Sequence, residues 1–150
     1  MPGTYHSLKL HLVFSTKRRE RWLTSDLRPR IHEYLGGIVR SEGGAVLAVG
    51  GVEDHVHLLV GWRTNVAIAD LLRNLKASSS RWMHQTFPAL SGFAWQEGYG
   101  VFSVSDSQVD RVREYIRTQE DHHRQRTFQE EFEAFLKAHG VEYEARYLWD

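Results

Sequence analysis

The chain has 150 residues with 19 basic and 19 acidic side chains, and it contains no cysteine. This length suits one domain with one hydrophobic core, and the lack of cysteine excludes disulfides and thiolate metal sites. Because no stretch has the pattern of a signal peptide or the length of a membrane span, we expect a cytoplasmic protein. Residues 1–126 carry 17 basic and 13 acidic side chains, which permits a local phosphate-binding surface despite the neutral total.

The order of hydrophobic patterns along the chain predicts eight elements. They are a strand over 5–16, a helix between Ser25 and Gly43, strands over 45–52 and 55–61, a helix over 66–87, a strand or bent hairpin over 93–104, and helices over 107–122 and 128–139. This order predicts an α+β fold, a ferredoxin-like or RRM-like antiparallel sheet with packed helices. We expect a single domain over residues 1–150, with the C-terminal helix and tail from about residue 128 as an appendage.

The strand over 55–61 contains the sequence His-Val-His. Strand side chains alternate between faces, so His55 and His57 point to one side while Val56, Leu58 and Val60 point to the other. Two imidazoles about 7 Å apart along a strand can converge on one cation, and the apolar face holds the strand rigid. The pattern alone is also typical of two surface histidines, so a metal site needs a further ligand from elsewhere in the chain.

The helix over 107–122 offers such a ligand beside a nucleophile. Val109, Val112 and Ile116 form its apolar stripe. Tyr115 and Gln119 are four residues apart and share the face next to that stripe. An amide oxygen can bind a hard cation, and a phenol can attack a phosphate held by that cation. Taken singly, Tyr115 also fits a half-buried helix aromatic and Gln119 a solvated polar residue.

Five segments together resemble the single-tyrosine HUH insertion-sequence transposases, which include the repeat-associated tyrosine transposases. Each motif is weak alone, but their order extends over nearly the whole chain. The segments are HLVFSTK at 11–17, DHVHLLV at 54–60, LKASS at 75–79, WQEGYGVFSVS at 95–105 and YIRTQEDHH at 115–123. The resemblance implies a homodimeric enzyme that cleaves and rejoins single-stranded DNA with hairpin ends.

The resemblance also implies roles for individual residues. His55 and His57 would be two metal ligands, Gln119 the third, and Tyr115 the nucleophile that forms a 5′-phosphotyrosine link. A site of two imidazoles and one amide oxygen suits Mg²⁺ or Mn²⁺, and we expect both to support activity. Because one phosphodiester is exchanged for another, no ATP is needed. His123, one turn after Gln119, is a candidate to orient a ligand or to contact phosphate.

Basic side chains in three segments are candidates for contacts with DNA phosphates. Arginines of this kind are also typical of a solvated surface. Aromatic residues of the segment over 93–104 could stack on unpaired bases, although strand aromatics more often pack in a core. The candidate contacts are Lys17, Arg18 and Arg19 after the first strand, Arg73, Lys76 and Arg81 on the helix over 66–87, and Arg117 beside the tyrosine.

Other functions fit parts of the same pattern. A non-catalytic RRM-like module would bind nucleic acid through stacked aromatics and would need neither metal nor tyrosine. A metal-dependent phosphodiesterase would depend on the histidines but would use water, so it would leave no protein–DNA adduct. A relative adopted by a host genome, which acts on repeats elsewhere, would share all the motifs named above.

Overall fold

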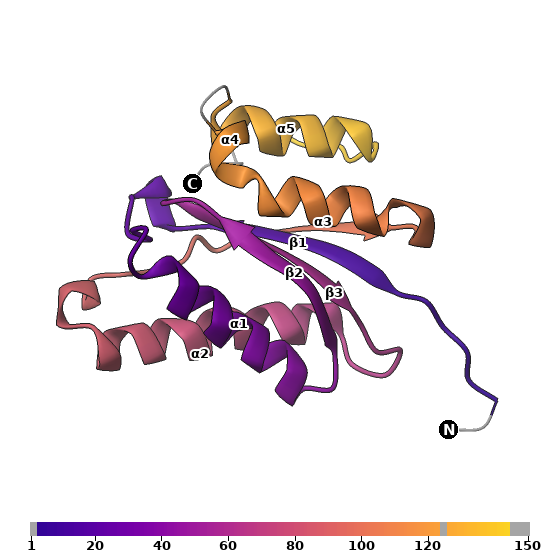
Figure 1. The fold of residues 1–150 in the computed structure, drawn as a ribbon, viewed down its shortest axis with the longest axis horizontal. Coiled ribbons are helices and arrows are strands. Elements are labelled where there is room, and N and C mark those ends of the chain that lie inside the picture. Colours follow the sequence, from indigo (N-terminus) through magenta and orange to yellow (C-terminus); the bar gives the residue numbers. More distant parts are fainter. Residues whose placement is uncertain (1–2, 124–125, 145–150) are drawn as a thin grey trace.

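The computed structural model describes residues 3–123 and 126–144. Four strands form one antiparallel sheet in the order β2-β3-β1-β4 (Figure 1). The strands are β1 (Lys9–Ser15), β2 (Ala45–Gly51), β3 (His55–Gly61) and β4 (Gly100–Val104). This order puts β1 and β3 at the centre of the sheet and confirms the predicted α+β fold of ferredoxin-like kind.

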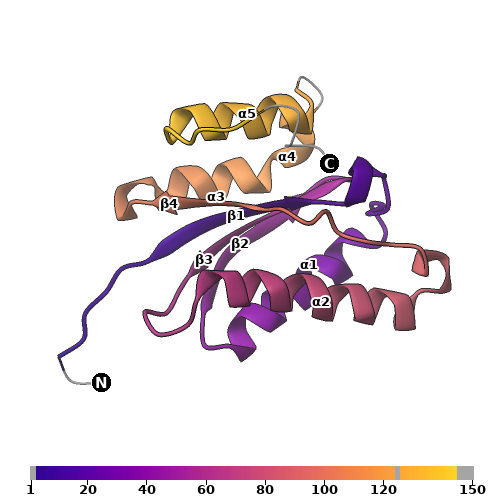
Figure 2. The ribbon, with the colours of Figure 1, turned by 180° about the vertical axis from the view of Figure 1, so that it is seen from behind.

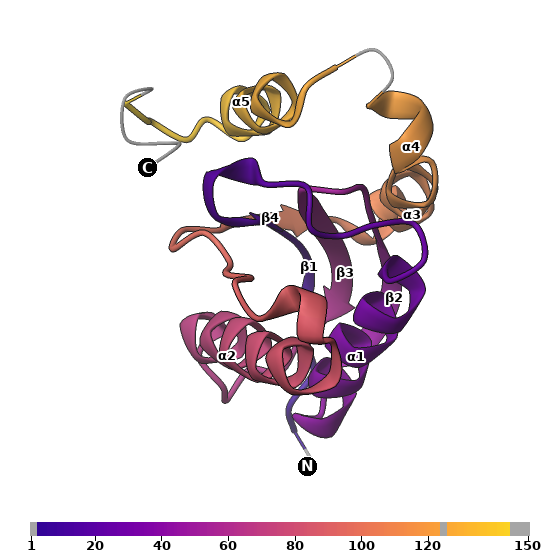
Figure 3. The ribbon, with the colours of Figure 1, turned by 90° about the vertical axis from the view of Figure 1, so that its left-hand side faces the viewer.

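Helices cover both faces of the sheet and make a three-layered molecule (Figure 3). One face carries α1 (Arg28–Ser41) and α2 (Ile68–Thr86), and the other carries α3 (Val109–Arg117), α4 (Gln119–His122) and α5 (Phe128–Ala138) (Figures 1 and 2). Short 3-10 turns occur at Lys17–Arg19, Pro88–Leu90 and Asp106–Gln108. Within residues 3–123 and 126–144, the helices are too short or too polar to cross a bilayer.

Each face of the sheet has its own hydrophobic core. The larger core lies against α1 and α2 and includes Phe93 and Trp95. The smaller core lies against α5 and includes Val13, Phe102 and Phe128. Three aromatic residues of the segment over 93–104 are therefore packed inside the protein rather than exposed for stacking on bases.

The strand predicted over 93–104 is shorter in the structure. Only residues 100–104 join the sheet, and Trp95 makes a single bridge with Thr16. The backbone carbonyls of residues 96–98 accept hydrogen bonds from the Lys76 amine instead of from a neighbouring strand. The first strand is also shorter than predicted, because its pairing with β3 and β4 begins at Lys9.

The single helix predicted over 107–122 is interrupted at Thr118. This residue has φ −104° and ψ 28°, and its hydroxyl donates to the backbone carbonyl of Glu114 at 2.9 Å. The backbone N–H of Thr118 donates to the same carbonyl at 3.1 Å, and a hydroxyl that bonds back in this way often bends a helix. The chain therefore turns between α3 and α4, so that Gln119 is buried whereas Tyr115 is half-buried.

Gly50 lies where β2 meets α3, next to the tyrosine. A Cβ atom at this position would lie 2.4 Å from the carbonyl oxygen of Ile116. We expect Gly50→Ala to lower the free energy of unfolding by about 2 kcal/mol through overpacking, measured by chemical denaturation. The control is Gly37→Ala, because a Cβ there meets no atom within 4 Å. That helical substitution should raise stability by roughly 0.5–1 kcal/mol, and equal effects of the two would contradict a close contact at Gly50.

Candidate active site

β3 presents His55 and His57 on the face that α3, α4 and α5 cover. Both side chains are completely buried, and their ring centroids lie 5.0 Å apart. Val56, Leu58 and Val60 pack in the larger core on the opposite face. The alternation predicted from the sequence is therefore present, and the two imidazoles converge on one side of a central strand.

Each imidazole is oriented by a neighbour through its Nδ1 atom. Nδ1 of His55 lies 2.8 Å from a carboxylate oxygen of Asp54, and Nδ1 of His57 lies 2.8 Å from Nε2 of His11 on β1. The Nε2 atoms of both rings point toward side chains of α4 and α5. Metal-binding histidines generally have such a partner on the second nitrogen. His11 belongs to the first of the five motif segments. The local sequence pattern did not predict that it orients His57.

Replacing His11 with phenylalanine is expected to weaken metal binding by about 10–100-fold, the usual effect of removing an orienting partner. Phenylalanine keeps the ring volume that packs against Phe102 and Phe135, but it cannot bond to Nδ1 of His57. Calorimetric titration with Mn²⁺ measures the change. His6→Phe is the control because His6 is exposed. Unchanged affinity in His11→Phe would show that His57 keeps its orientation without this partner.

Tyr115 and Gln119 reach the histidines of their own chain. Gln119 is 1% exposed, and its Oε1 atom lies 3.2 Å from Nε2 of His55. The Tyr115 ring lies edge-on to His57, with centroids 5.9 Å apart. The Tyr115 hydroxyl donates to the carboxylate of Glu131 on α5. The structure thus brings together the four residues that the sequence predicts for catalysis and metal binding.

Glu131 is the member of this site that sequence reasoning missed. Its side chain is 1% exposed despite its charge. The carboxylate lies 3.0 Å from Nε2 of His57, 3.4 Å from Nε2 of His55 and 3.2 Å from Nε2 of His123. One carboxylate therefore contacts three imidazoles and the tyrosine hydroxyl.

The spacing of Glu131 within α5 is a feature of the sequence that could have identified it as a buried residue of the site. Thr127 caps the helix and exchanges hydrogen bonds with Glu130 in a capping box. Glu131 lies three residues after Phe128 and four before Phe135, which puts it on the apolar stripe of the helix. An acidic residue on such a stripe is buried and needs charged or polar partners. The acidic composition of α5 as a whole hides this signal, because most acidic residues on a helix lie on a solvated face.

His55, His57, His123 and Glu131 form a group that could hold a metal ion. Each offers one ligand atom, and the four atoms lie within 4.8 Å of one another. Nε2 of His123 is buried and lies 3.2 Å from Glu131 without hydrogen-bond geometry, which fits an atom directed at a cation. Imidazoles, a carboxylate and the amide of Gln119 are donors that suit a divalent cation.

Burial and charge pairing act against each other in this cluster. Burial alone would raise the pKa of Glu131, but close contacts with the imidazoles of His123, His55 and His57 hold that pKa well below its usual range. Burial lowers the pKa of His55, and hydrogen bonds to Asp54 and Glu131 outweigh it and raise the pKa to about 9. Burial, followed by the charge of Glu131, raises the pKa of Tyr115 well above its usual value. Tyr115 therefore needs a nearby positive charge to lose its proton near neutral pH.

Arg18 and Arg19 lie in the turn after β1 and line a groove beside this site. Both have positive φ angles, 57° and 56°. Four arginines, three carboxylates and His123 line the groove. Guanidinium groups next to a candidate metal centre favour a path for a phosphate backbone. Contacts of DNA with Lys17, Arg18 and Arg19 stay a prediction.

The basic residues of α2 lie on the opposite face of the sheet from the histidines. The Lys76 amine donates to three backbone carbonyls between 2.6 and 2.9 Å, and burial lowers its pKa to about 8. Arg73 and Arg117 form ion pairs within their own helices, and Arg81 is exposed. The structure does not bring Arg73, Lys76 or Arg81 to the candidate active site, and their contacts with DNA are untested.

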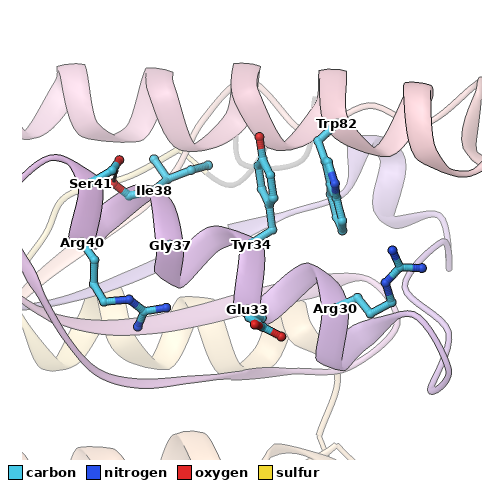
Figure 4. Close-up of a pocket in the computed structure, with 8 residues that line it drawn as sticks. All are labelled: Arg30, Glu33, Tyr34, Gly37, Ile38, Arg40, Ser41 and Trp82. Carbon is cyan, nitrogen blue, oxygen red and sulfur yellow. Dashed lines mark hydrogen bonds between the residues drawn. The ribbon is translucent and has the colours of Figure 1, made fainter.

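A second groove lies between α1 and α2. It is lined by Tyr34 and Trp82, whose rings face each other with centroids 4.4 Å apart and planes 8° from parallel (Figure 4). The guanidinium of Arg30 lies 5.9 Å from the centre of the Trp82 ring. Because this groove is on the opposite face of the sheet from His55 and His57, it is separate from the candidate active site.

Comparisons with known proteins agree with this geometry. A family model described as "Transposase IS200 like" matches residues 4–119. The ISDra2 transposase TnpA of Deinococcus radiodurans is 29% identical over 124 residues, which cover 79% of this chain and 89% of that protein. The family match ends at Gln119, so His123 and Glu131 lie beyond it.

Two solved structures share the fold. A transposase from Deinococcus radiodurans has a TM-score of 0.64 and 29% identity, over 79% of this chain and 95% of that chain. A REP-associated tyrosine transposase bound to a REP hairpin has a TM-score of 0.58 and 12% identity, over 79% of this chain and 70% of that chain. Because this second structure is only 12% identical in sequence, its likeness to the chain shows the fold alone.

Proposed function

The chain belongs to the IS200-like transposase family, and on this premise we propose that it cleaves and rejoins single-stranded DNA with Tyr115 as the nucleophile. The observation that carries the proposal is the convergence of Tyr115, Gln119 and the two β3 histidines within one chain. Side chains from β3, α3 and α4 meet there although Tyr115 follows His55 by 60 residues and His57 by 58 residues in the sequence. A packed core alone would not need this set of residues.

The reaction exchanges one phosphodiester for another. The oxygen of Tyr115 attacks the scissile phosphorus, the bond from phosphorus to the 3′-oxygen breaks, and a 5′-phosphotyrosine forms. Overall, the phenol loses a proton and the departing 3′-oxygen gains one. In the rejoining step a 3′-hydroxyl of another strand end attacks the same phosphorus and releases Tyr115.

His55, His57 and Gln119 would hold a divalent metal, Mg²⁺ or Mn²⁺, through two imidazole nitrogens and one amide oxygen. When bound, the metal supplies positive charge that stabilises the phosphate in the transition state and favours the ionised phenol. Asp54 and His11 keep the imidazoles in place.

The DNA substrate would be single-stranded with hairpin ends. This proposal is supported by the family and by the REP-associated tyrosine transposase, which is bound to a REP hairpin. We also propose a homodimer, on the basis of the family resemblance, and a cytoplasmic location, on the basis of the sequence pattern. Light scattering of the purified protein measures the mass in solution and tests the dimer.

A denaturing gel tests the proposed function. The protein is incubated with hairpin-forming single-stranded DNA and Mn²⁺, with and without a chelator. A label at the 3′ end of the DNA should move into a slow protein–DNA band, because the tyrosine would bind the 5′ end of the labelled fragment. The same sequence as a full duplex is the control and should give no band.

Each alternative function gives a different pattern on this gel. A phosphodiesterase would shorten the DNA in Mn²⁺ without any covalent band. A binding module would leave the DNA intact in every lane. Either result would contradict a tyrosine transposase, and a covalent band that persists in chelator would contradict the metal.

A further inference from the structure

The carboxylate of Glu131 lies beside the proposed metal ligands. Those ligands are two imidazoles and one amide, and none of them carries a negative charge. Its Oε1 atom is 3.0 Å from Nε2 of His57 and 3.4 Å from Nε2 of His55, and its Oε2 atom is 3.2 Å from Nε2 of His123. The same Nε2 atoms of His55 and His57 are those that would bind the metal. A cation placed between these nitrogens would therefore also be within reach of Glu131.

The distances within this cluster suit one ion. The four ligand atoms lie within 4.8 Å of one another, and two ligands on opposite sides of one ion lie about 4.0–4.4 Å apart. Shifts of a few tenths of an ångström would bring all four atoms to one centre. A buried carboxylate is costly unless a positive charge offsets it, and a divalent ion bound at this position would supply that charge.

The helix that carries Glu131 is positioned by several contacts that do not involve the carboxylate. Thr127 caps the first turn. Phe128 stacks on the His55 ring with centroids 4.3 Å apart, and Phe135 lies edge-on to His11. Because Glu131 lies on the same face of α5 as these two phenylalanines, the docked helix directs it into the cluster.

We propose that Glu131 is a further protein ligand of the metal, which α5 supplies in addition to His55, His57 and Gln119. This inference rests on the proposed metal-dependent function, but it concerns a residue beyond the segment that matches the family model. Metal binding then joins α5 to β3 through one ion. The presence of metal should hold α5 against the sheet, and the docking of α5 should strengthen metal binding.

Calorimetric titration of the full chain with Mn²⁺ tests the ligand. Glu131→Gln keeps the size of the side chain and one carbonyl oxygen but removes the charge, and we expect the Mn²⁺ dissociation constant to rise at least about tenfold. Glu133→Gln is the matched control, since it makes the same change on the same helix outside the metal-binding group, and its dissociation constant should stay within about twofold of the wild type. Circular dichroism without metal checks that both variants are folded.

Hydrogen exchange provides a readout that does not depend on affinity. In the wild type and in Glu133→Gln, Mn²⁺ should slow the exchange of the α5 amides, because the ion holds the helix on the sheet. In Glu131→Gln, saturating Mn²⁺ should leave α5 exchange unchanged while it still protects β3.

The outcomes separate this inference from the proposed function. Equal Mn²⁺ affinity in Glu131→Gln and wild type, or tighter binding in the variant, would overturn the role of Glu131 and leave the histidine site intact. A wild-type protein that forms the DNA adduct but shows no metal protection of α5 would also overturn it. A wild-type protein that binds no Mn²⁺ would contradict both proposals.

Discussion

Tyr115→Phe is expected to abolish the covalent protein–DNA adduct and to reduce strand cleavage by at least about 10³-fold. The substitution removes the oxygen that would attack phosphorus. The ring keeps its contacts with Phe135 and His122, so the fold of α3 and α5 should persist. The measurement is the denaturing gel with 3′-labelled hairpin DNA and Mn²⁺, quantified over time.

Tyr99→Phe is the matched control for this prediction. Tyr99 is 43% exposed and lies beside Lys76 of α2, on the opposite face of the sheet from the histidines. This variant should form the adduct as fast as the wild type. Mn²⁺ affinity should be nearly unchanged in Tyr115→Phe, which separates loss of the nucleophile from loss of the metal. If Tyr115→Phe still formed an adduct, the nucleophile would be a different residue.

His57→Ala is expected to weaken Mn²⁺ binding by at least about 100-fold and to reduce cleavage by about 10³-fold. The imidazole provides one ligand atom, and its loss also removes the acceptor or donor that pairs with His11. The buried carboxylate of Glu131 loses a contact of 3.0 Å and becomes less well compensated. Calorimetry with Mn²⁺ and the cleavage gel measure the two effects on the same preparation.

His84→Ala is the control for the loss of a histidine. His84 lies on α2 and bonds to the backbone carbonyl of Phe93, far from the proposed metal. It should leave both Mn²⁺ affinity and cleavage within about twofold of the wild type. Wild-type cleavage by His57→Ala in Mn²⁺ would contradict the metal site. If His57→Ala and His84→Ala lowered the melting temperature and the cleavage rate equally, the loss of cleavage would come from altered packing and not from loss of a metal ligand.

Local sequence pattern was sufficient to predict the sheet and most of the helices. Alternation along a strand and the helical period are properties of backbone geometry, so they can be read from neighbouring residues. For this reason the pattern placed His55 and His57 on one face of a strand, and Tyr115 near Gln119 on one side of a helix. The break at Thr118 was not visible, because a threonine hydroxyl bonds back to the carbonyl four residues earlier only in some local geometries.

The sequence by itself determined which faces of each element are apolar, which side chains share a face, and the order of elements that specifies the sheet. The tertiary structure alone decided that Glu131 contacts His57 across 74 residues of chain, and that His11 orients the same ring. It also decided that Lys76 binds the carbonyls of residues 96–98. The physical reason is that the direction of a side chain follows from local dihedral angles, whereas its partners depend on how whole apolar surfaces dock.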